Sequence, residues 1–288
     1  IKNRNILLYL IPSVMNVNGK IILVSTPRFL SYFNELLEDV KNIKLWFKSI
    51  LIAVDKEAVD EKGKPVWSDE KLEKAKQLMS ESKFRQDYFC DTDVANENAI
   101  YAESLLKAEW IKDLNISNKK LYVSEDLGIN DSTALVFTVD NTIIHHYAAT
   151  DKATIHYIEY IKTFMKEHNI KDVEIILPHD ARNRQDAIDY LTSRREAYNQ
   201  HFKDVRVLRA YEVNKTIEIT RHSIEKHKIK FLDCAAVRDM VRLMKAYEWK
   251  IDNSTEENLR VPIHGRGLAA SNTCDAVEYY CMSMFLEE

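Results

Sequence analysis

The chain has 288 residues, which is enough for one large domain or two ordinary ones. Hydrophobic residues make up 45% of it and charged residues 30%, so a sizeable core can form and intrinsic disorder is excluded as the default state. The net charge of -4 excludes an overall field that attracts nucleic acid, so any DNA binding must come from a local basic face.

Cysteine usage and apolar runs narrow the class further. Four cysteines stand apart without a CxxC pair, which indicates free thiols in a reducing compartment rather than disulfides or a zinc site. No apolar run approaches the ~20 residues that span a bilayer, so we expect no membrane partner. The chain opens with Ile1 and shows no signal peptide, and we expect it to be a fragment of a longer protein.

The first 115 residues predict a mixture of helices and one strand. Residues 19–27, GKIILVSTP, predict a short strand that ends at Pro27, because proline cannot continue the ladder. Helices are predicted at residues 29–40, at 68–79 with Ser68 as N-cap, and at 102–114 as a connection.

From residue 116 the pattern becomes that of an α/β domain. Strands are predicted at residues 121–128, 133–139, 142–149, 173–177 and 205–209. Helices are predicted at residues 155–168, 185–193, 216–227, 235–247 and 268–286. Three successive strands followed by alternating helices and strands predict a mixed sheet flanked by helices. We therefore expect two domains, residues 1–115 and 116–288.

Three aspartates stand at the ends of predicted elements. Asp126 ends a strand just before Gly128, which can turn the backbone away. Asp180 follows a second strand, and Asp275 lies near the start of the last helix, where the macrodipole favours a carboxylate. Taken singly, such aspartates are commonly turn formers or caps, so the prediction rests on their combination.

Carboxylates brought together repel one another and persist most readily when cations hold them. Hard oxygen ligands select Mg²⁺ or Mn²⁺ over zinc. Two such ions, about 3.5–4 Å apart, suit the hydrolysis of a phosphodiester. The three aspartates therefore predict a two-metal site.

Three segments carry a resemblance to a known family. They are residues 126–137, DLGINDSTALVF, residues 177–181, LPHDA, and residues 264–276, HGRGLAASNTCDA. In order and spacing they resemble the RNase H-like nuclease domain of the phage DNA-packaging terminase large subunit. The resemblance implies that Asp126, Asp180 and Asp275 bind metal and that Asp131 is an accessory ligand. In that family a histidine often precedes the last aspartate; here Asn272 stands nearby, and His179 and His264 are the alternatives.

The first part of the chain resembles the end of the terminase ATPase domain, a P-loop α/β segment. Ser25, Thr26 and Pro27 are similar to the family's motif that couples ATP hydrolysis to motion. No GxxxxGK[ST] loop is present, nor an apolar strand ending in Asp-Glu, so the phosphate-binding parts are missing. The resemblance therefore implies a truncated ATPase segment without ATPase activity of its own.

Basic residues near these motifs are candidates for contacts with DNA phosphates. They are Arg182, Arg184, Lys215, Arg221 and Arg266. For each, an ordinary solvated surface position stays an equal alternative.

The resulting hypothesis is a metal-dependent endonuclease that cuts double-stranded DNA during viral genome packaging. The resemblance implies the small terminase subunit and the portal as partners and the host cytoplasm as location. Two alternatives stay open: a transposase-like or resolvase-like strand-transfer enzyme on the same fold, and a prophage docking module whose acids no longer bind metal.

Overall fold

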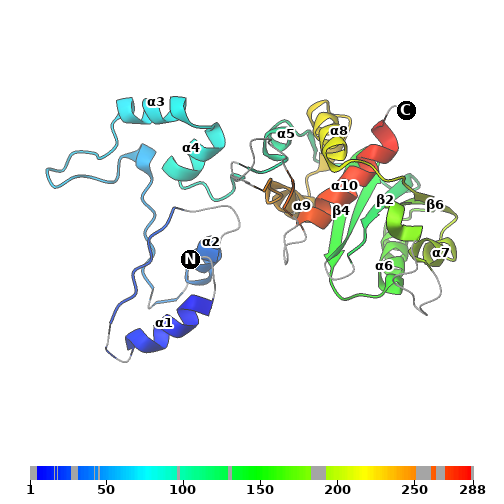
Figure 1. Ribbon diagram of the computed structural model, residues 1–288, viewed down its shortest axis with the longest axis horizontal. Helices are drawn as coiled ribbons and strands as arrows, with labels where there is room; N and C mark the ends of the chain where they lie inside the picture. The colour runs from blue at the N-terminus through cyan, green and yellow to red at the C-terminus, as the bar shows by residue number, and fades with distance from the viewer. Residues whose placement is uncertain are drawn as a thin grey trace. The chain divides into compact units, whose positions relative to one another are not determined.

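The computed structural model describes residues 5–15, 17, 19–26, 32–41, 43–44, 46–95, 98–128, 132–182, 193–250, 261–263 and 270–286. Contacts within the chain divide it into two compact units, Ile1–Asn98 and Ala99–Glu288 (Figure 1). The expected division into domains 1–115 and 116–288 stays a prediction. Among the residues described, no helix has the length and apolar character needed to cross a membrane.

In the described part of the first unit, helices are the regular secondary structure. Its helices are α1 (Asn5–Met15), α2 (Tyr32–Asp39), the short 3-10 helix η1 (Ala53–Asp55), α3 (Asp69–Leu78) and α4 (Glu81–Tyr88). The Ser68 hydroxyl accepts a hydrogen bond from the backbone N–H of Lys71 at 3.3 Å and thereby caps α3. The predicted helix at residues 68–79 with this N-cap is confirmed.

The strand predicted at residues 19–27 is wrong for its described part. Residues 19–26 have no regular secondary structure, and the side chains of Ile22 and Val24 are 83% and 91% exposed. A strand needs a neighbour to pair its backbone N–H and C=O groups, and the described part of this unit contains no other strand. Pro27 lies outside the described residues.

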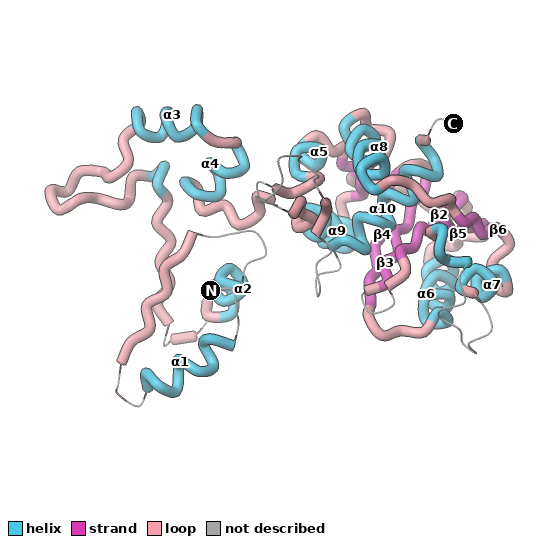
Figure 2. Tube along the Cα trace, in the orientation of Figure 1, coloured by secondary structure: helices cyan, strands magenta, loops and turns pink. Residues whose placement is uncertain are grey.

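The second unit is built on a seven-stranded mixed sheet, in the order β1-β7-β4-β3-β2-β5-β6 (Figure 2). Its strands are β1 (Trp110–Ile111), β2 (Lys120–Asp126), β3 (Thr133–Val139), β4 (Thr142–Ala149), β5 (Asp172–Leu177), β6 (Asp204–Val207) and β7 (Lys230–Leu232). The pairs β2–β3 and β3–β4 are antiparallel and the others are parallel. Asp140 and Asn141 make the tight turn between β3 and β4 with φ angles of 49° and 57°, which these residue types tolerate. The predicted α/β class with a mixed sheet flanked by helices is confirmed.

Helices cover both faces of this sheet. One face packs against α5 (Ala102–Leu106), α8 (Val213–Glu225), α9 (Ala235–Lys245) and α10 (Ala270–Phe285). The other packs against α6 (Thr154–Glu167) and α7 (Arg194–Asn199). Side chains alternate along β2, so Leu121 and Val123 face α6 and Tyr122 faces α10. By the same alternation the last two residues of β2, Glu125 and Asp126, face opposite sides.

Two predicted helices have different outcomes. The helix expected at residues 102–114 ends at Leu106, because Trp110 and Ile111 instead form a strand that pairs with β7. The Trp110 ring packs against Phe231 of β7 with ring centroids 5.5 Å apart, which favours the strand. The helix expected at residues 185–193 lies outside the described residues except for Ser193, which caps α7.

Candidate active site

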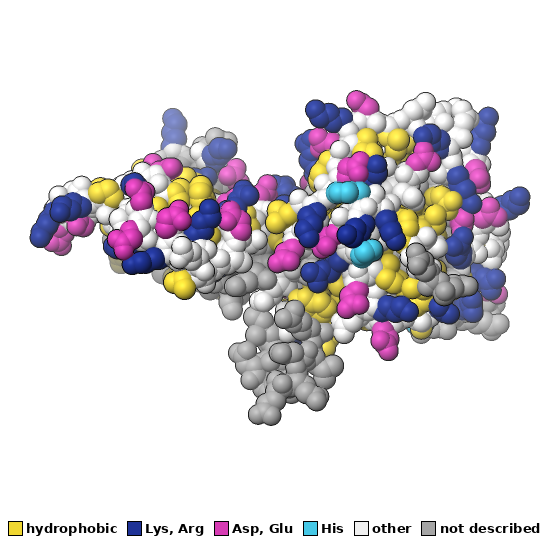
Figure 3. Space-filling view, turned by 90° about the horizontal axis from the view of Figure 1, so that it is seen from above, with side chains coloured by type: hydrophobic (Ala, Val, Ile, Leu, Met, Phe, Trp, Pro, Cys, Tyr) yellow, Lys and Arg dark blue, Asp and Glu magenta, His cyan; other side chains and the backbone are white. Residues whose placement is uncertain are grey.

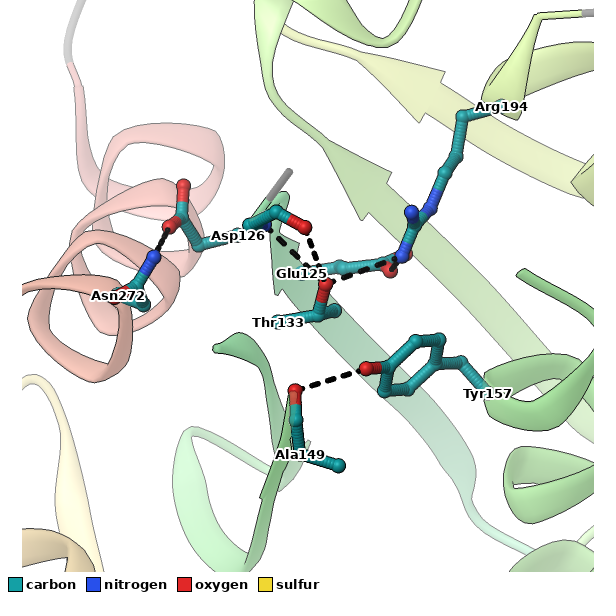
Figure 4. Close-up of polar contacts among 8 residues, drawn as sticks. Glu125, Asp126, Thr133, Ala149, Tyr157, Arg194 and Asn272 are labelled. Carbon is teal, nitrogen blue, oxygen red and sulfur yellow. Dashed lines mark hydrogen bonds and ion pairs between the residues drawn. The ribbon is translucent and has the colours of Figure 1, made fainter. Parts of the chain in front are cut away.

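The end of β2 places Asp126 against the first turn of α10. Its side chain is 8% exposed, and its Oδ2 accepts a hydrogen bond from Asn272 Nδ2 at 2.9 Å (Figure 4). The chain is held immediately after this acid, because the backbone N–H of Gly128 donates to Thr133 Oγ1 at 3.2 Å. The predicted position of Asp126 at a strand end is thus the position observed.

Burial and neighbouring acids make Asp126 an unusual carboxyl group. Burial raises the pKa of Asp126 to about 7, and the charges of Asp180 and Glu125 add to the rise. Hydrogen bonds from Asn272 and Tyr279 act in the opposite direction because they stabilise the ionised form. As a result, ionising the carboxyl group of Asp126 costs free energy unless a positive charge is nearby.

Asp275 belongs to the same electrostatic group. It lies on α10, three residues after Asn272, and burial raises its pKa well above the ordinary value. The nearby charge of Asp126 and then that of Glu278 add to this rise. Asp126 and Asp275 are far apart in sequence, and it is the packing of α10 on the sheet that brings them together.

Asp180 reaches the group from a third element. It lies on the 3-10 turn η2 (His179–Arg182), directly after β5, and its side chain is exposed. Its charge acts on the pKa of both Asp126 and Tyr279. The three predicted aspartates therefore come from β2, η2 and α10, and the charge of Asp126 links the other two electrostatically, whereas Asp131 lies outside the described residues.

A fourth acid, Glu278, was not anticipated from the sequence. It is 2% exposed and accepts hydrogen bonds from the hydroxyls of Tyr101, at 2.5 Å, and Thr216. Burial raises the pKa of Glu278 to about 7, with Asp126 adding to the rise and the two hydroxyls opposing it. Both oxygens are thus engaged, by Tyr101 beside α5 and by Thr216 of α8, which makes Glu278 a link between helices rather than a free ligand.

The opposite face of β2 carries a buried ion pair. Arg194 Nη2 donates to Glu125 Oε1 at 2.6 Å, and these side chains are 4% and 0% exposed. Arg194 also lies over the Tyr157 ring, 5.3 Å from its centroid. Figure 4 shows Asn272 and Arg194 approaching the end of β2 from opposite sides. Arg194 therefore neutralises the charge of Glu125 inside the core. Of the two adjacent acids, only Asp126 lies on the side of the candidate site.

Comparison with solved structures finds the same fold in a phage protein. The large terminase of a thermophilic bacteriophage superposes with a TM-score of 0.50 and 16% identity, over 91% of this chain and 62% of that chain. The same large terminase in complex with ATP-gamma-S superposes with a TM-score of 0.50 and 15% identity, over 99% of this chain and 68% of that one. The chain has the fold of a phage large terminase. No protein-family model matches the sequence, and no curated protein matches it either.

In the first comparison, this chain spans about three fifths of the length of the phage terminase. The resemblance stated from the sequence is therefore confirmed as a large-terminase fold. Ser25 and Thr26, which that resemblance assigns to the coupling motif, are exposed, and the Ser25 hydroxyl donates to the Thr26 carbonyl at 3.1 Å. Their role stays a prediction.

The predicted DNA-binding residues of this terminase fold are only partly among the described ones. Arg182 is exposed at the end of η2, two residues after Asp180, while Arg184 and Arg266 lie outside the described residues. Lys215 is exposed and Arg221 half-buried on α8, the helix that supplies Thr216 to Glu278. On the face drawn in Figure 3, the described Lys and Arg side chains of the second unit stand among acidic ones rather than in an unbroken basic patch.

The donor set fits a metal ion in its chemistry. Asp126, Asp180 and Asp275 offer only carboxylate oxygens, which suit Mg²⁺ or Mn²⁺, and the pKa rises of Asp126 and Asp275 reflect in part a repulsion that a cation would relieve. Within the residues that the structure describes, however, no three acidic, histidine or cysteine side chains are arranged as ligands of one ion. The complete ligand set therefore stays a prediction.

Besides Glu278, sequence reasoning missed Tyr279 and the hydrogen-bonding role of Asn272. Asn272 stands where the family resemblance leads one to expect a histidine, and its amide donates to Asp126 instead. The histidine that contacts this turn of α10 is His146 of β4, whose Nε2 lies 3.1 Å from Thr273 Oγ1. Burial lowers the pKa of His146 to about 4, so it is neutral at pH 7. The alternatives from sequence, His179 and His264, lie respectively on η2 and outside the described residues.

Proposed function

We propose that this chain is a metal-dependent endonuclease that cuts double-stranded DNA during viral genome packaging. Asp126, Asp180 and Asp275 bind two Mg²⁺ or Mn²⁺ ions, with Asp131 as an accessory ligand. The observation that carries the proposal is that Asp126 shares a charged environment with Asp180 of η2 and Asp275 of α10, and that the pKa values of Asp126 and Asp275 are strongly raised. Enzymes concentrate such perturbed groups at functional sites.

The chain's own residues have defined tasks in this reaction. The buried Asp126 and the partly buried Asp275 supply negative charge to the site, and the exposed Asp180 adds a third carboxylate. Bound divalent ions supply activation of water and stabilisation of the leaving oxygen of a phosphodiester. Arg182, two residues after Asp180, is placed to contact a DNA phosphate beside the cut, and Arg184, Arg266, Lys215 and Arg221 are further candidates.

The setting follows from the same proposal. By the family resemblance of the sequence, the proposed substrate is double-stranded DNA, the proposed partners are the small terminase subunit and the portal, and the proposed location is the host cytoplasm. ATPase activity is not part of this proposal for the given chain, whose sequence shows no GxxxxGK[ST] loop.

Replacing the acids tests the proposal directly. In a plasmid-nicking assay with Mn²⁺, we expect Asp126→Ala and Asp275→Ala each to lower the cleavage rate on the order of 100-fold or more, because a lost ligand removes an ion or misplaces it. Asp172→Ala is the matched control, since this exposed aspartate begins β5 at the strand end away from Asp180. Cleavage by both alanine variants at the wild-type rate would refute the proposal.

A docking module without metal is the second candidate. It is favoured by the lack of a three-ligand group among the described side chains. Calorimetric titration with Mn²⁺ separates the two functions: the nuclease shows saturable binding that Asp126→Ala weakens, and the docking module shows none.

A further inference from the structure

One face of α10 carries three polar side chains toward the end of β2. Asn272, Asp275 and Tyr279 stand at positions i, i+3 and i+7, which share one side of an α-helix. The Asn272 amide donates to Oδ2 of Asp126 at 2.9 Å, and the Tyr279 hydroxyl, further along the same face of the helix, lowers the pKa of the same carboxyl group as a nearby donor does. The middle residue is the predicted ligand Asp275. This face of α10 thus supplies one candidate ligand and orients another.

Tyr279 is partly buried and feels the charges of all three predicted aspartates. Burial raises the pKa of Tyr279, and the charges of Asp126, Asp275 and Asp180 all add to the rise. The phenol therefore keeps its proton at neutral pH and acts as a donor.

A carboxylate at a strand end turns easily, because the terminal torsion of aspartate is broad. Two donors fixed on one helix restrict that torsion and leave the remaining lone pairs of Asp126 in a set direction. In metal sites, such outer hydrogen bonds orient the ligands, and their loss typically lowers metal affinity or activity by about 10- to 100-fold.

We propose that Tyr279 and Asn272 are positioning residues that hold the Asp126 carboxylate in its metal-binding orientation. This rests on the proposed nuclease function and extends it to two residues that touch neither the water nor the leaving group. This role suits Asn272, because its side-chain amide can donate a hydrogen bond to the ionised Asp126 carboxylate, which can only accept one.

Tyr279→Phe tests the inference, with Tyr280→Phe as its matched control. Both variants remove one phenol oxygen from adjacent positions of α10, but Tyr280 donates to Asn141 Oδ1 at 2.8 Å, on the turn between β3 and β4. In the full chain we expect Tyr279→Phe to weaken Mn²⁺ binding about 10-fold by calorimetry and to lower kcat for plasmid nicking by a similar factor. KM for DNA stays within about twofold, because the phenol orients a metal ligand and does not bind the duplex. Tyr280→Phe is expected to bind Mn²⁺ and to cut at the wild-type level.

Asn272→Ala provides a second, independent variant. Alanine preserves helix propensity at this partly buried position, so the loss of the donor is separated from the loss of the helix. We expect the same weakening of Mn²⁺ binding at an unchanged thermal midpoint. If both variants bind Mn²⁺ and cut as the wild type does, or if their losses merely follow a fall in thermal midpoint, the positioning role is refuted. A wild-type chain that neither binds Mn²⁺ nor cuts DNA refutes instead the nuclease function.

Discussion

Arg194 shows how a single side chain can be misread as part of a basic surface. In sequence it stands beside Arg195 and close after Arg182 and Arg184, yet its guanidinium is buried against Glu125. Tyr198 is buried in the same core, where burial and then the Glu125 charge raise the pKa of its hydroxyl. The pair joins α7 to the middle of the sheet.

Removing one partner of this pair leaves a buried charge uncompensated. We expect Arg194→Met to lower the free energy of unfolding by about 3–5 kcal/mol, measured by urea denaturation. The exposed neighbour provides the control, and Arg195→Met changes the free energy by less than about 0.5 kcal/mol.

A double variant separates charge from packing. Combining Glu125→Leu with Arg194→Met removes both charges, so we expect it to recover most of the loss. A double variant as unstable as Arg194→Met alone would show that the arginine acts through its packing on Tyr157 and not through the ion pair.

Among the secondary-structure elements, α10 is tied to α5 and α8 by Glu278. The folded-state pKa of Glu278 is raised from an ordinary 4.5 to about 7, so the folded chain binds its proton more tightly than the unfolded chain does. The contribution of protonated Glu278 to the free energy of unfolding is therefore full below about pH 4.5 and is lost as the pH rises through 7. The shift corresponds to roughly 3 kcal/mol.

Glu278→Gln removes this titration while keeping an acceptor for Tyr101 or Thr216. We expect the free energy of unfolding, measured without metal between about pH 4.5 and 8, to fall by roughly 3 kcal/mol less in the variant than in the wild type. Glu159→Gln, at an exposed position of α6, leaves the wild-type pH dependence unchanged. An equal fall in the wild type and Glu278→Gln would contradict the assignment.

The elements differ in how far the sequence predicts them. Strands β2, β3 and β4 could be predicted because each is a run of strand formers bounded by turn residues, as at Asp140 and Asn141. At residues 19–27 the same local pattern predicted a strand wrongly, because a strand forms only beside a partner strand that local sequence does not specify.

The candidate site divides along the same line. Asp126, Asp180 and Asp275 could be predicted because each occupies the end or start of an element, where the backbone direction is known. Tyr279 and Glu278 sit inside α10, and their roles depend on which strand and helices pack against that helix. No local pattern encodes such a contact, and neither residue was found from sequence.

On the scale of the whole molecule, residues 99–115 decide how the chain can be divided. Tyr101 is fully buried and bonded to Glu278, and β1 pairs with β7. We expect a fragment of residues 99–288 to unfold cooperatively, and a fragment of residues 116–288 to melt about 10 °C lower or more, because it loses these contacts. Thermal denaturation of the two fragments measures the difference. Equal midpoints would place the boundary at 115 after all.

The adjacent acids Glu125 and Asp126 have a consequence for folding accuracy. Shifting β2 by one position against its neighbours would turn Asp126 into the apolar layer beside α6 and bring Glu125 out toward α10. Depending on the direction of the shift, the shorter Asp126 or the uncharged Ser124 would stand where Arg194 now meets the Glu125 carboxylate at 2.6 Å. The Glu125–Arg194 ion pair therefore favours the observed register of β2 against its neighbours. It does so on the strand whose last residue is the candidate site residue Asp126.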